Sequence, residues 1–293
     1  MVNEAAFESI KVRYLALWLI VFLIAIGVLH ALTRGLLAGA EWEVAVGFLF
    51  YIIIAYWIIS NFERVHIDYH KFIGNFPYNY NWISLFTIIF AVIILTLGLG
   101  ELSRYILSTI DPNLLNHLPS TSLFYTPHET PLAPFLNFMD FIIAVIMAPI
   151  VEEFLFRGVL LHRFTIKWGI KWAILGSSII FGLGHSDVIG AFTFAMVMCI
   201  LYIKTASLLV PILAHMTNNM MAYGTQIMST FSPSNQYGYT IASHDLLVAL
   251  LLLAISIVII IYFLYQNWPQ RFWRPPYFQE IYDGIPENLY YDE

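Results

Sequence analysis

Charged residues are scarce in this chain of 293 residues. Lys, Arg, Asp and Glu together make up 11% of the sequence, whereas 60% of the residues are hydrophobic. A soluble domain usually contains about 25% charged residues. Several apolar runs reach the roughly 18–20 residues that are needed to cross the hydrocarbon core of a bilayer. The composition therefore excludes an ordinary soluble domain and predicts a polytopic membrane protein of the all-α class.

Cysteine and an excess of basic residues are also lacking. The lone Cys199 excludes an internal disulfide framework and a cysteine-based zinc motif. Because 13 Lys and Arg face 19 Asp and Glu, there is no basic excess of the kind that attracts nucleic acid, and we expect no such partner. No internal repeat is visible, which argues against a transporter built from two repeated halves.

Hydropathy predicts a compact helical bundle with about eight transmembrane helices. The first apolar run follows Lys11 and Arg13 and is longer than the core of a typical signal peptide, so we expect it to be an uncleaved span. The predicted spans are residues 14–33, 43–60, 83–100, 137–162, 170–188, 189–204, 207–228 and 245–266.

The basic residues of the predicted loops orient this set of spans. If the N-terminus is cytoplasmic, only Arg34 and Arg104 fall outside, which satisfies the positive-inside rule. We therefore expect a multi-pass protein of a bacterial plasma membrane with both termini in the cytoplasm. The residues then predicted on the cytoplasmic side are Lys11, Arg13, Arg64, Lys71, Arg163, Lys167, Lys171, Lys204, Arg271 and Arg274.

Three charged residues interrupt the fourth predicted span, namely Glu152, Glu153 and Arg157. A charged side chain at the bilayer centre costs roughly 2.5–3.5 kcal/mol on insertion scales, so these residues need partners or a function. Glu153 and Arg157 are i,i+4 neighbours on a helix and can form an ion pair. Glu152 points about 100° away from Glu153 and is predicted to remain free for general-base chemistry. The alternative is an ion pair that serves packing alone.

Further polar residues lie in the fifth and seventh predicted spans. His215 and Asn219 are also i,i+4 neighbours and can donate hydrogen bonds to a developing oxyanion, with Asn218 as a possible substitute. His185 follows two glycines and could hold a water molecule together with Glu152, although counting residues places it nearer the outer end of its span. A histidine that only bonds a backbone carbonyl between helices is the structural alternative.

These residues fall into three motifs that resemble those of a known family. The sequence contains Glu152-Glu153-x-x-x-Arg157, then Phe181-x-x-x-His185, then His215-x-x-x-Asn219. This order is similar to that of the CAAX-protease and bacteriocin-processing family, also called the CPBP or ABI family, which includes the eukaryotic type II CAAX prenyl endopeptidase. Each motif is weak alone, but three in order within apolar segments form a strong signal. The matching region covers roughly residues 136–228.

The resemblance implies an intramembrane glutamic endopeptidase that uses no metal and no other cofactor. The expected partners are membrane lipid and a peptide or protein substrate at the membrane, and the motifs do not identify that substrate. The expected division of the chain is N-terminal helices with a proline-rich loop (1–135), a catalytic membrane core (136–228), and a last helix with a cytoplasmic tail (229–293). The implied roles are general base for Glu152, water activation for His185, oxyanion hole for His215 and Asn219, and organisation of the site for Glu153 and Arg157.

Three rival functions remain open at this point. Glu152, His185 and His215 could in principle bind zinc, although the sequence has no His-Glu-x-x-His motif. A transporter could use the same residues as a proton relay. A non-catalytic membrane scaffold or immunity protein could retain the fold without the chemistry.

Overall fold

The protein is an all-helical bundle, which confirms the predicted fold class. The computed structural model describes residues 2–33, 39–77, 81–110, 125–126, 128, 130–230, 243–270, 273–279, 281–282 and 285–286. Most of the predicted proline-rich loop, together with Arg34 and Arg271, lies outside these residues. The elements are α1 (Val2–Ser9), α2 (Val12–Leu32), α3 (Ala40–Arg64), α4 (Tyr69–Ile73), α5 (Trp82–Ile110), α6 (Ala133–Phe141), η2 (Ile142–Met147), α7 (Ala148–Glu153), η3 (Phe154–Leu160), α8 (Leu161–Trp168), α9 (Ile170–Leu183), α10 (Val188–Thr205), α11 (Leu209–Thr230), α12 (Ser243–Asn267), the 3₁₀ turn η5 (Pro276–Phe278), and the short antiparallel pair β1 (Ile281–Tyr282) and β2 (Ile285–Pro286).

Six helices among the described residues are long and apolar enough to cross a membrane. The other two predicted spans correspond to α9 and α11. The 14 residues of α9 reach only about 21 Å, less than the roughly 30 Å of a hydrocarbon core. The sequence of α11 carries several polar side chains, which lower its hydropathy. The six candidate spans are Glu4–Leu32, Ala40–Arg64, Trp82–Ile110, Ala133–Trp168, Val188–Thr205 and Leu246–Asn267.

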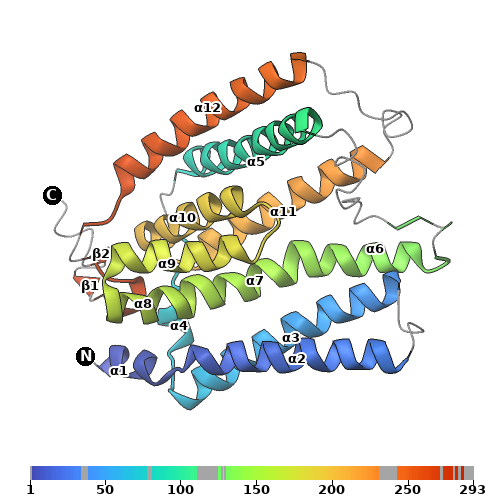
Figure 1. The fold of residues 1–293 in the computed structure, drawn as a ribbon. Helices are drawn as coiled ribbons and strands as arrows, with labels where there is room; N and C mark the ends of the chain where they lie inside the picture. Colours follow the sequence, from blue (N-terminus) through green and yellow to red (C-terminus); the bar gives the residue numbers. More distant parts are fainter. Residues whose placement is uncertain are drawn as a thin grey trace.

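α9 ends earlier than the predicted fifth span. The helix stops at Leu183, and His185 lies in the short turn that leads into α10. This turn lies beside the middle of the long fourth span rather than at its end (Figure 1). The expected continuation of the fifth span to residue 188 is therefore wrong. Glu152 and His185 lie 17 and 16 residues from Gly169, which joins their two helices, so both lie at a similar height in the bundle.

The fourth span is one rod of 36 residues, from Ala133 to Trp168. Two π-helical segments, η2 and η3, lie within it, on either side of α7. Pro149 occupies the first turn of α7, a position where the missing N–H of proline is tolerated. Because π-helical turns inside α-helices are frequent at functional sites, the unusual backbone around Glu152 and Glu153 indicates that this part of the rod has a function.

The helices pack in layers on both sides of this rod. α2 and α3 cover one side, the α9–α10 pair and α11 cover the other, and α5 and α12 lie together beyond them (Figure 1). The two chain ends meet at one end of the bundle, where the Phe7 ring contacts the rings of Tyr277 and Phe278 at 5.6 and 5.4 Å between centroids. The first helix and the segment after α12 therefore pack together at this end of the bundle.

Candidate active site

Glu153 and Arg157 form the ion pair that their spacing predicts. The Arg157 Nη1 atom donates to Glu153 Oε1 at 2.8 Å, and both side chains are fully buried. Arg157 Nη2 also donates to the carbonyl of Ala195 at 3.1 Å. The guanidinium therefore ties α10 to the fourth span, and it balances the charge of a glutamate that water cannot reach.

His215 on α11 joins both glutamates. Its Nδ1 lies 2.8 Å from Glu153 Oε1, and its Nε2 lies 3.8 Å from Glu152 Oε2. An ionised carboxylate can only accept hydrogen bonds, so the Nδ1 atom must carry the proton in the contact with Glu153. The Nε2 atom of a neutral ring is then a proton acceptor that faces Glu152, and it becomes a donor only when the ring carries both protons.

Glu152 is not free, contrary to the expectation from helical spacing. The Tyr51 hydroxyl on α3 donates to Glu152 Oε1 at 2.6 Å. The two carboxylate oxygens of Glu152 are thus directed to different neighbours, one to Tyr51 and the other towards His215. The Glu152 side chain is 13% exposed, whereas that of Glu153 is wholly buried, so of the two glutamates it is Glu152 that solvent can reach.

Phe181 connects the second motif to the other two. Its carbonyl accepts a hydrogen bond from His185 Nδ1 at 2.8 Å, and its ring stacks on the His185 ring at 4.4 Å. The same ring lies 5.1 Å from the Arg157 guanidinium carbon and 5.9 Å from the His215 ring. Because a carbonyl only accepts, His185 Nδ1 carries the proton, and its Nε2 lone pair remains available.

His185 and Glu152 do not contact each other directly. His185 is exposed in the α9–α10 turn, and in the described part of the chain it makes no hydrogen bond or ion pair with Glu152. A water molecule held by both residues would therefore have to bridge a wider gap than the sequence alone suggests. His215 is the histidine that the structure places next to Glu152.

Asn219 lies on the same face of α11 as His215. Its Nδ2 donates to the carbonyl of Ala144 at 2.8 Å, and its Oδ1 accepts from Asn218 Nδ2 at 3.2 Å. An amide group has two N–H donors, so one donor of Asn219 remains after the bond to Ala144. Asn218 is thus a direct hydrogen-bond partner of Asn219.

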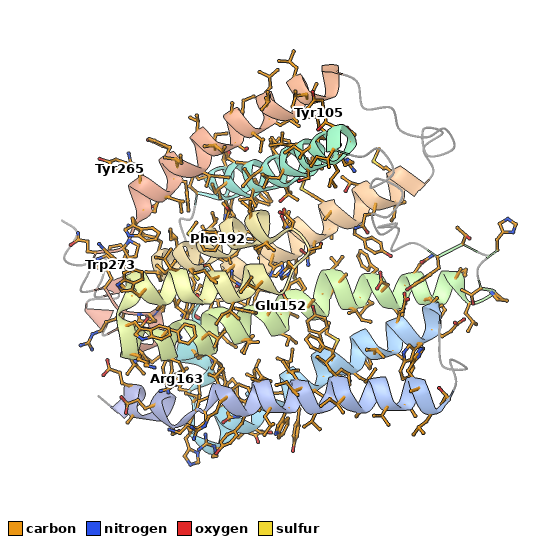
Figure 2. The ribbon with its side chains drawn as sticks, viewed as in Figure 1. Tyr105, Glu152, Arg163, Phe192, Tyr265 and Trp273 are labelled. Carbon is orange, nitrogen blue, oxygen red and sulfur yellow. The ribbon has the colours of Figure 1, made fainter. Side chains whose placement is uncertain are left out.

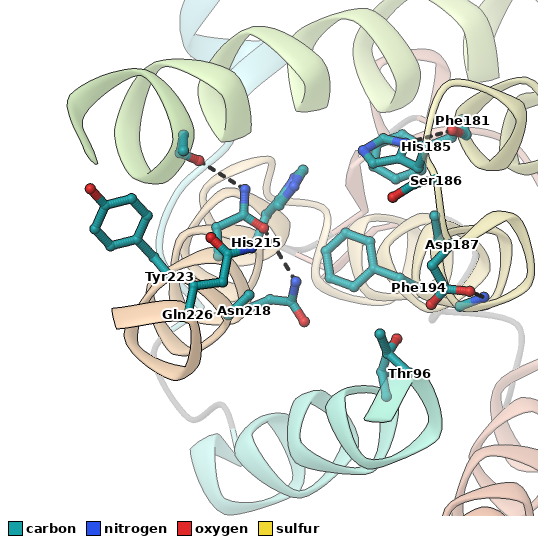
Figure 3. A pocket seen from close by; sticks show the side chains of 16 residues that line it. Thr96, Phe181, His185, Ser186, Asp187, Phe194, His215, Asn218, Tyr223 and Gln226 are labelled. Carbon is teal, nitrogen blue, oxygen red and sulfur yellow. Dashed lines mark hydrogen bonds between the residues drawn. The ribbon is translucent and has the colours of Figure 1, made fainter. Parts of the chain in front are cut away.

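A cavity of about 370 Å³ lies against these groups. Figure 3 shows His215 and Asn218 on one wall, His185 and Asp187 on another, and Thr96 of α5 opposite them. Glu152 does not line this cavity; the His215 ring, which does, lies between the cavity and the glutamates. The cavity wall therefore contains residues of the second and third motifs. His215 connects this wall to the glutamates of the first motif.

The three residues that a zinc ion would need are dispersed. Within the ranges that the structure describes, no group of three or more His, Cys, Asp or Glu side chains is arranged to hold a metal ion. Glu152 approaches His215, but His185 turns its Nδ1 to a backbone carbonyl. Zinc binding by this set would require the α9–α10 turn to move.

Two side chains of the site have contacts that the sequence does not predict. Tyr51 lies in an apolar span, where a tyrosine hydroxyl usually needs a hydrogen-bond partner. That signal is unspecific, because Tyr56 in the same helix is 61% exposed and Tyr202 is buried elsewhere. Phe181 belongs to the second motif, but its contacts with Arg157 and His215 depend on how three helices pack.

Part of this chain is similar to known proteins. Residues 134–221 match the family model described as "Type II CAAX prenyl endopeptidase Rce1-like". The chain is also 36% identical over 85 residues to a protein of Bacillus subtilis (strain 168) named "Putative membrane peptidase YdiL". That alignment covers 27% of this chain and 33% of the relative, so the chain matches about a third of the relative's length. No solved structure matches the chain.

The matched segment contains all three motifs. It begins just inside α6 and ends within α11, and so includes Glu152, His185 and Asn219. Tyr51 lies outside it. The resemblance that the motifs predict is confirmed for this segment: residues 134–221 are similar to the Rce1-like type II CAAX prenyl endopeptidases.

Proposed function

We propose that the protein is an intramembrane endopeptidase that hydrolyses a peptide bond of a membrane-associated substrate by a glutamate-based, metal-independent mechanism. The observation that carries this proposal is the contact of one histidine, His215, with both glutamates at the wall of a cavity. The match to prenyl endopeptidases supports the reaction class. We infer that the substrate is a peptide precursor or a prenylated protein.

In the proposed reaction Glu152 is the general base. A water molecule bound at its carboxylate gives up a proton as its oxygen attacks the scissile carbonyl, and the proton later passes to the departing amine. Tyr51 holds one carboxylate oxygen at 2.6 Å, which leaves the other directed towards the reaction site. His185, with its Nε2 lone pair free, assists by accepting a hydrogen bond from the water.

His215 and Asn219 are the proposed donors to the oxyanion. Asn219 has one N–H that its bond to Ala144 does not use, and His215 donates through Nε2 when its ring carries both protons. Donors of this kind contribute about 100- to 1,000-fold to acyl-transfer rates. Glu153 and Arg157 take no direct part; they fix the His215 ring through its Nδ1 atom.

A comparison of membrane proteomes tests the proposal and does not require the substrate to be identified first. Cells that lack the protein are supplied with either the wild-type chain or Glu152→Ala, and new N-termini in the membrane fraction are mapped by mass spectrometry. We expect cleavage products with the wild-type chain and none with the variant at equal abundance. Equal products from both chains, or complementation of a deletion phenotype by Glu152→Ala, would favour a scaffold instead. Chelator-sensitive cleavage by the purified protein would favour a zinc enzyme.

A further inference from the structure

A basic hollow lies at the end of the bundle where the chain begins. It has a volume of about 310 Å³ and is formed between the α1–α2 junction and α8. Figure 2 labels Arg163 at this end, away from Glu152. Its seven lining residues are Lys11, Val12, Arg13, Arg163, Phe164, Lys167 and Trp168, so four of the seven are cationic and none is acidic.

The four cations come from two separate parts of the fold. Lys11 and Arg13 flank the start of α2, whereas Arg163 and Lys167 are i,i+4 neighbours on α8. Like charges at this spacing destabilise a helix slightly, and Lys11 and Arg13 add a second like-charged pair to the same hollow. The fold therefore concentrates positive charge here at some cost, which a bound anion would remove.

These cations lack the polar side-chain partners that other cations at the same end possess, although Arg13 and Lys167 lie over the rings of Tyr14 and Trp168 at 5.4 and 5.1 Å. Arg274 lies 3.4 Å from the Glu4 carboxylate, and Arg64 donates to Asn61 Oδ1 at 2.9 Å. By contrast, none of the four residues of the basic hollow forms an ion pair with a carboxylate in the described part of the chain. Lys11 reaches only the Glu8 carbonyl, at 3.4 Å. The positive-inside rule accounts for cations on this side, but it does not require four cations without a carboxylate around one hollow.

The position of the hollow matches that of lipid headgroups. Two candidate membrane spans, Glu4–Leu32 and Ala133–Trp168, have their ends here. Trp168 is 47% exposed at its rim, as is usual for tryptophan at a membrane interface. Beyond the hollow, α2 presents exposed apolar side chains such as Leu17 and Ile20. A phosphate among the cations would thus leave an acyl chain beside an apolar helix face.

We propose that the basic hollow binds the phosphate group of a membrane lipid with net negative charge. Basic pockets between membrane helices bind such headgroups, and each Lys or Arg near an anionic surface contributes about fivefold in affinity. A zwitterionic lipid is disfavoured, because its ammonium group would meet the same four cations. The proposal is independent of the peptidase function, since the hollow contains none of the proposed catalytic residues.

Thermal unfolding of the purified full-length protein in nonionic detergent tests this site. Phosphatidylglycerol, phosphatidylcholine and inorganic phosphate are each titrated, and bound lipid is counted by native mass spectrometry. We expect phosphatidylglycerol to raise the unfolding temperature of the wild-type protein and to remain bound, while phosphatidylcholine does neither. The variant Arg163→Gln/Lys167→Gln should bind phosphatidylglycerol about 25-fold more weakly, as expected for two lost cations.

Lys171→Gln is the matched control for Lys167→Gln. Lys171 is also exposed and lies near the same end, but it lines a different hollow. The single Lys167→Gln variant should lose about fivefold in affinity, and Lys171→Gln should stay within about twofold of the wild type. Equal losses in both variants, or equal binding of both lipids, would overturn the proposal. Stabilisation by inorganic phosphate alone, lost in Lys167→Gln, would assign the site to a soluble phosphate compound instead of a lipid.

Discussion

Two buried histidines have different surroundings: His215 of α11 contacts the fourth span, and His162 lies within that span. His215 is 3% exposed, stands between two carboxylates and lines the cavity. His162 is fully buried, and aromatic rings surround it, with the Phe7 and Phe278 centroids at 4.7 and 4.8 Å. Its Nδ1 bonds the Arg157 carbonyl at 3.1 Å. Burial of a histidine therefore does not by itself mark a site; neighbouring charge and access to a cavity distinguish His215 from His162.

The largest expected effect comes from breaking the charge pair behind His215. Glu153→Gln leaves the Arg157 guanidinium buried without its carboxylate, and removing one partner of a buried ion pair costs about 3–5 kcal/mol. Denaturant titration of the purified protein in detergent gives the free energy of unfolding and so measures this loss. The control is Glu101→Gln, which breaks the partly exposed pair with Arg104 and should cost at most about 1 kcal/mol. Similar losses in both variants would contradict the role given to the buried pair.

Tyr51→Phe tests the second carboxylate beside His215, that of Glu152. The change removes only the hydroxyl that orients Glu152, and a hydrogen bond to a charged group is worth about 1.5–3 kcal/mol. We expect at least a tenfold slower appearance of cleavage products, with the protein still folded. Tyr56→Phe is the control, because Tyr56 lies on the same helix but is 61% exposed. An unchanged rate in Tyr51→Phe would show that Glu152 needs no support from α3.

The smallest effect is expected at His162. In His162→Phe an aromatic ring remains among the aromatic neighbours, and residue 162 neither lines the cavity nor pairs with a glutamate in the described part of the chain. Cleavage should stay within about twofold of the wild type, whereas His215→Phe should abolish it. Product mapping of both variants in one strain makes the comparison. If both histidines prove equally necessary, the distinction between them fails.

The sequence predicts the local relations of the site correctly and the long-range ones poorly. The i,i+4 rule places Arg157 on Glu153 because both lie on one helix, whatever the rest of the fold does. The Tyr51–Glu152 bond joins residues 101 positions apart, and no local rule specifies such a contact. The fourth predicted span ends at residue 162, yet the meeting of both chain ends buries His162 completely. The end of α9 at Leu183, five residues before the predicted end of the fifth span, likewise depends on packing.

Because of its π-helical segments, the fourth span tolerates the deletion of one residue better at some positions than at others. In η3 each hydrogen-bonded turn holds one residue more than an α turn. Deleting Val159 or Leu160 can convert this segment to regular α-helix while the flanking helices keep their rotational phase. The α-helical segment Ala148–Glu153 contains no such extra residue. A deletion within it would turn Glu152 by about 100° away from Tyr51 and His215. Loss of one residue can thus be absorbed within either π-helical segment, on both sides of α7, whereas loss within α7 changes the register of the turn that carries Glu152.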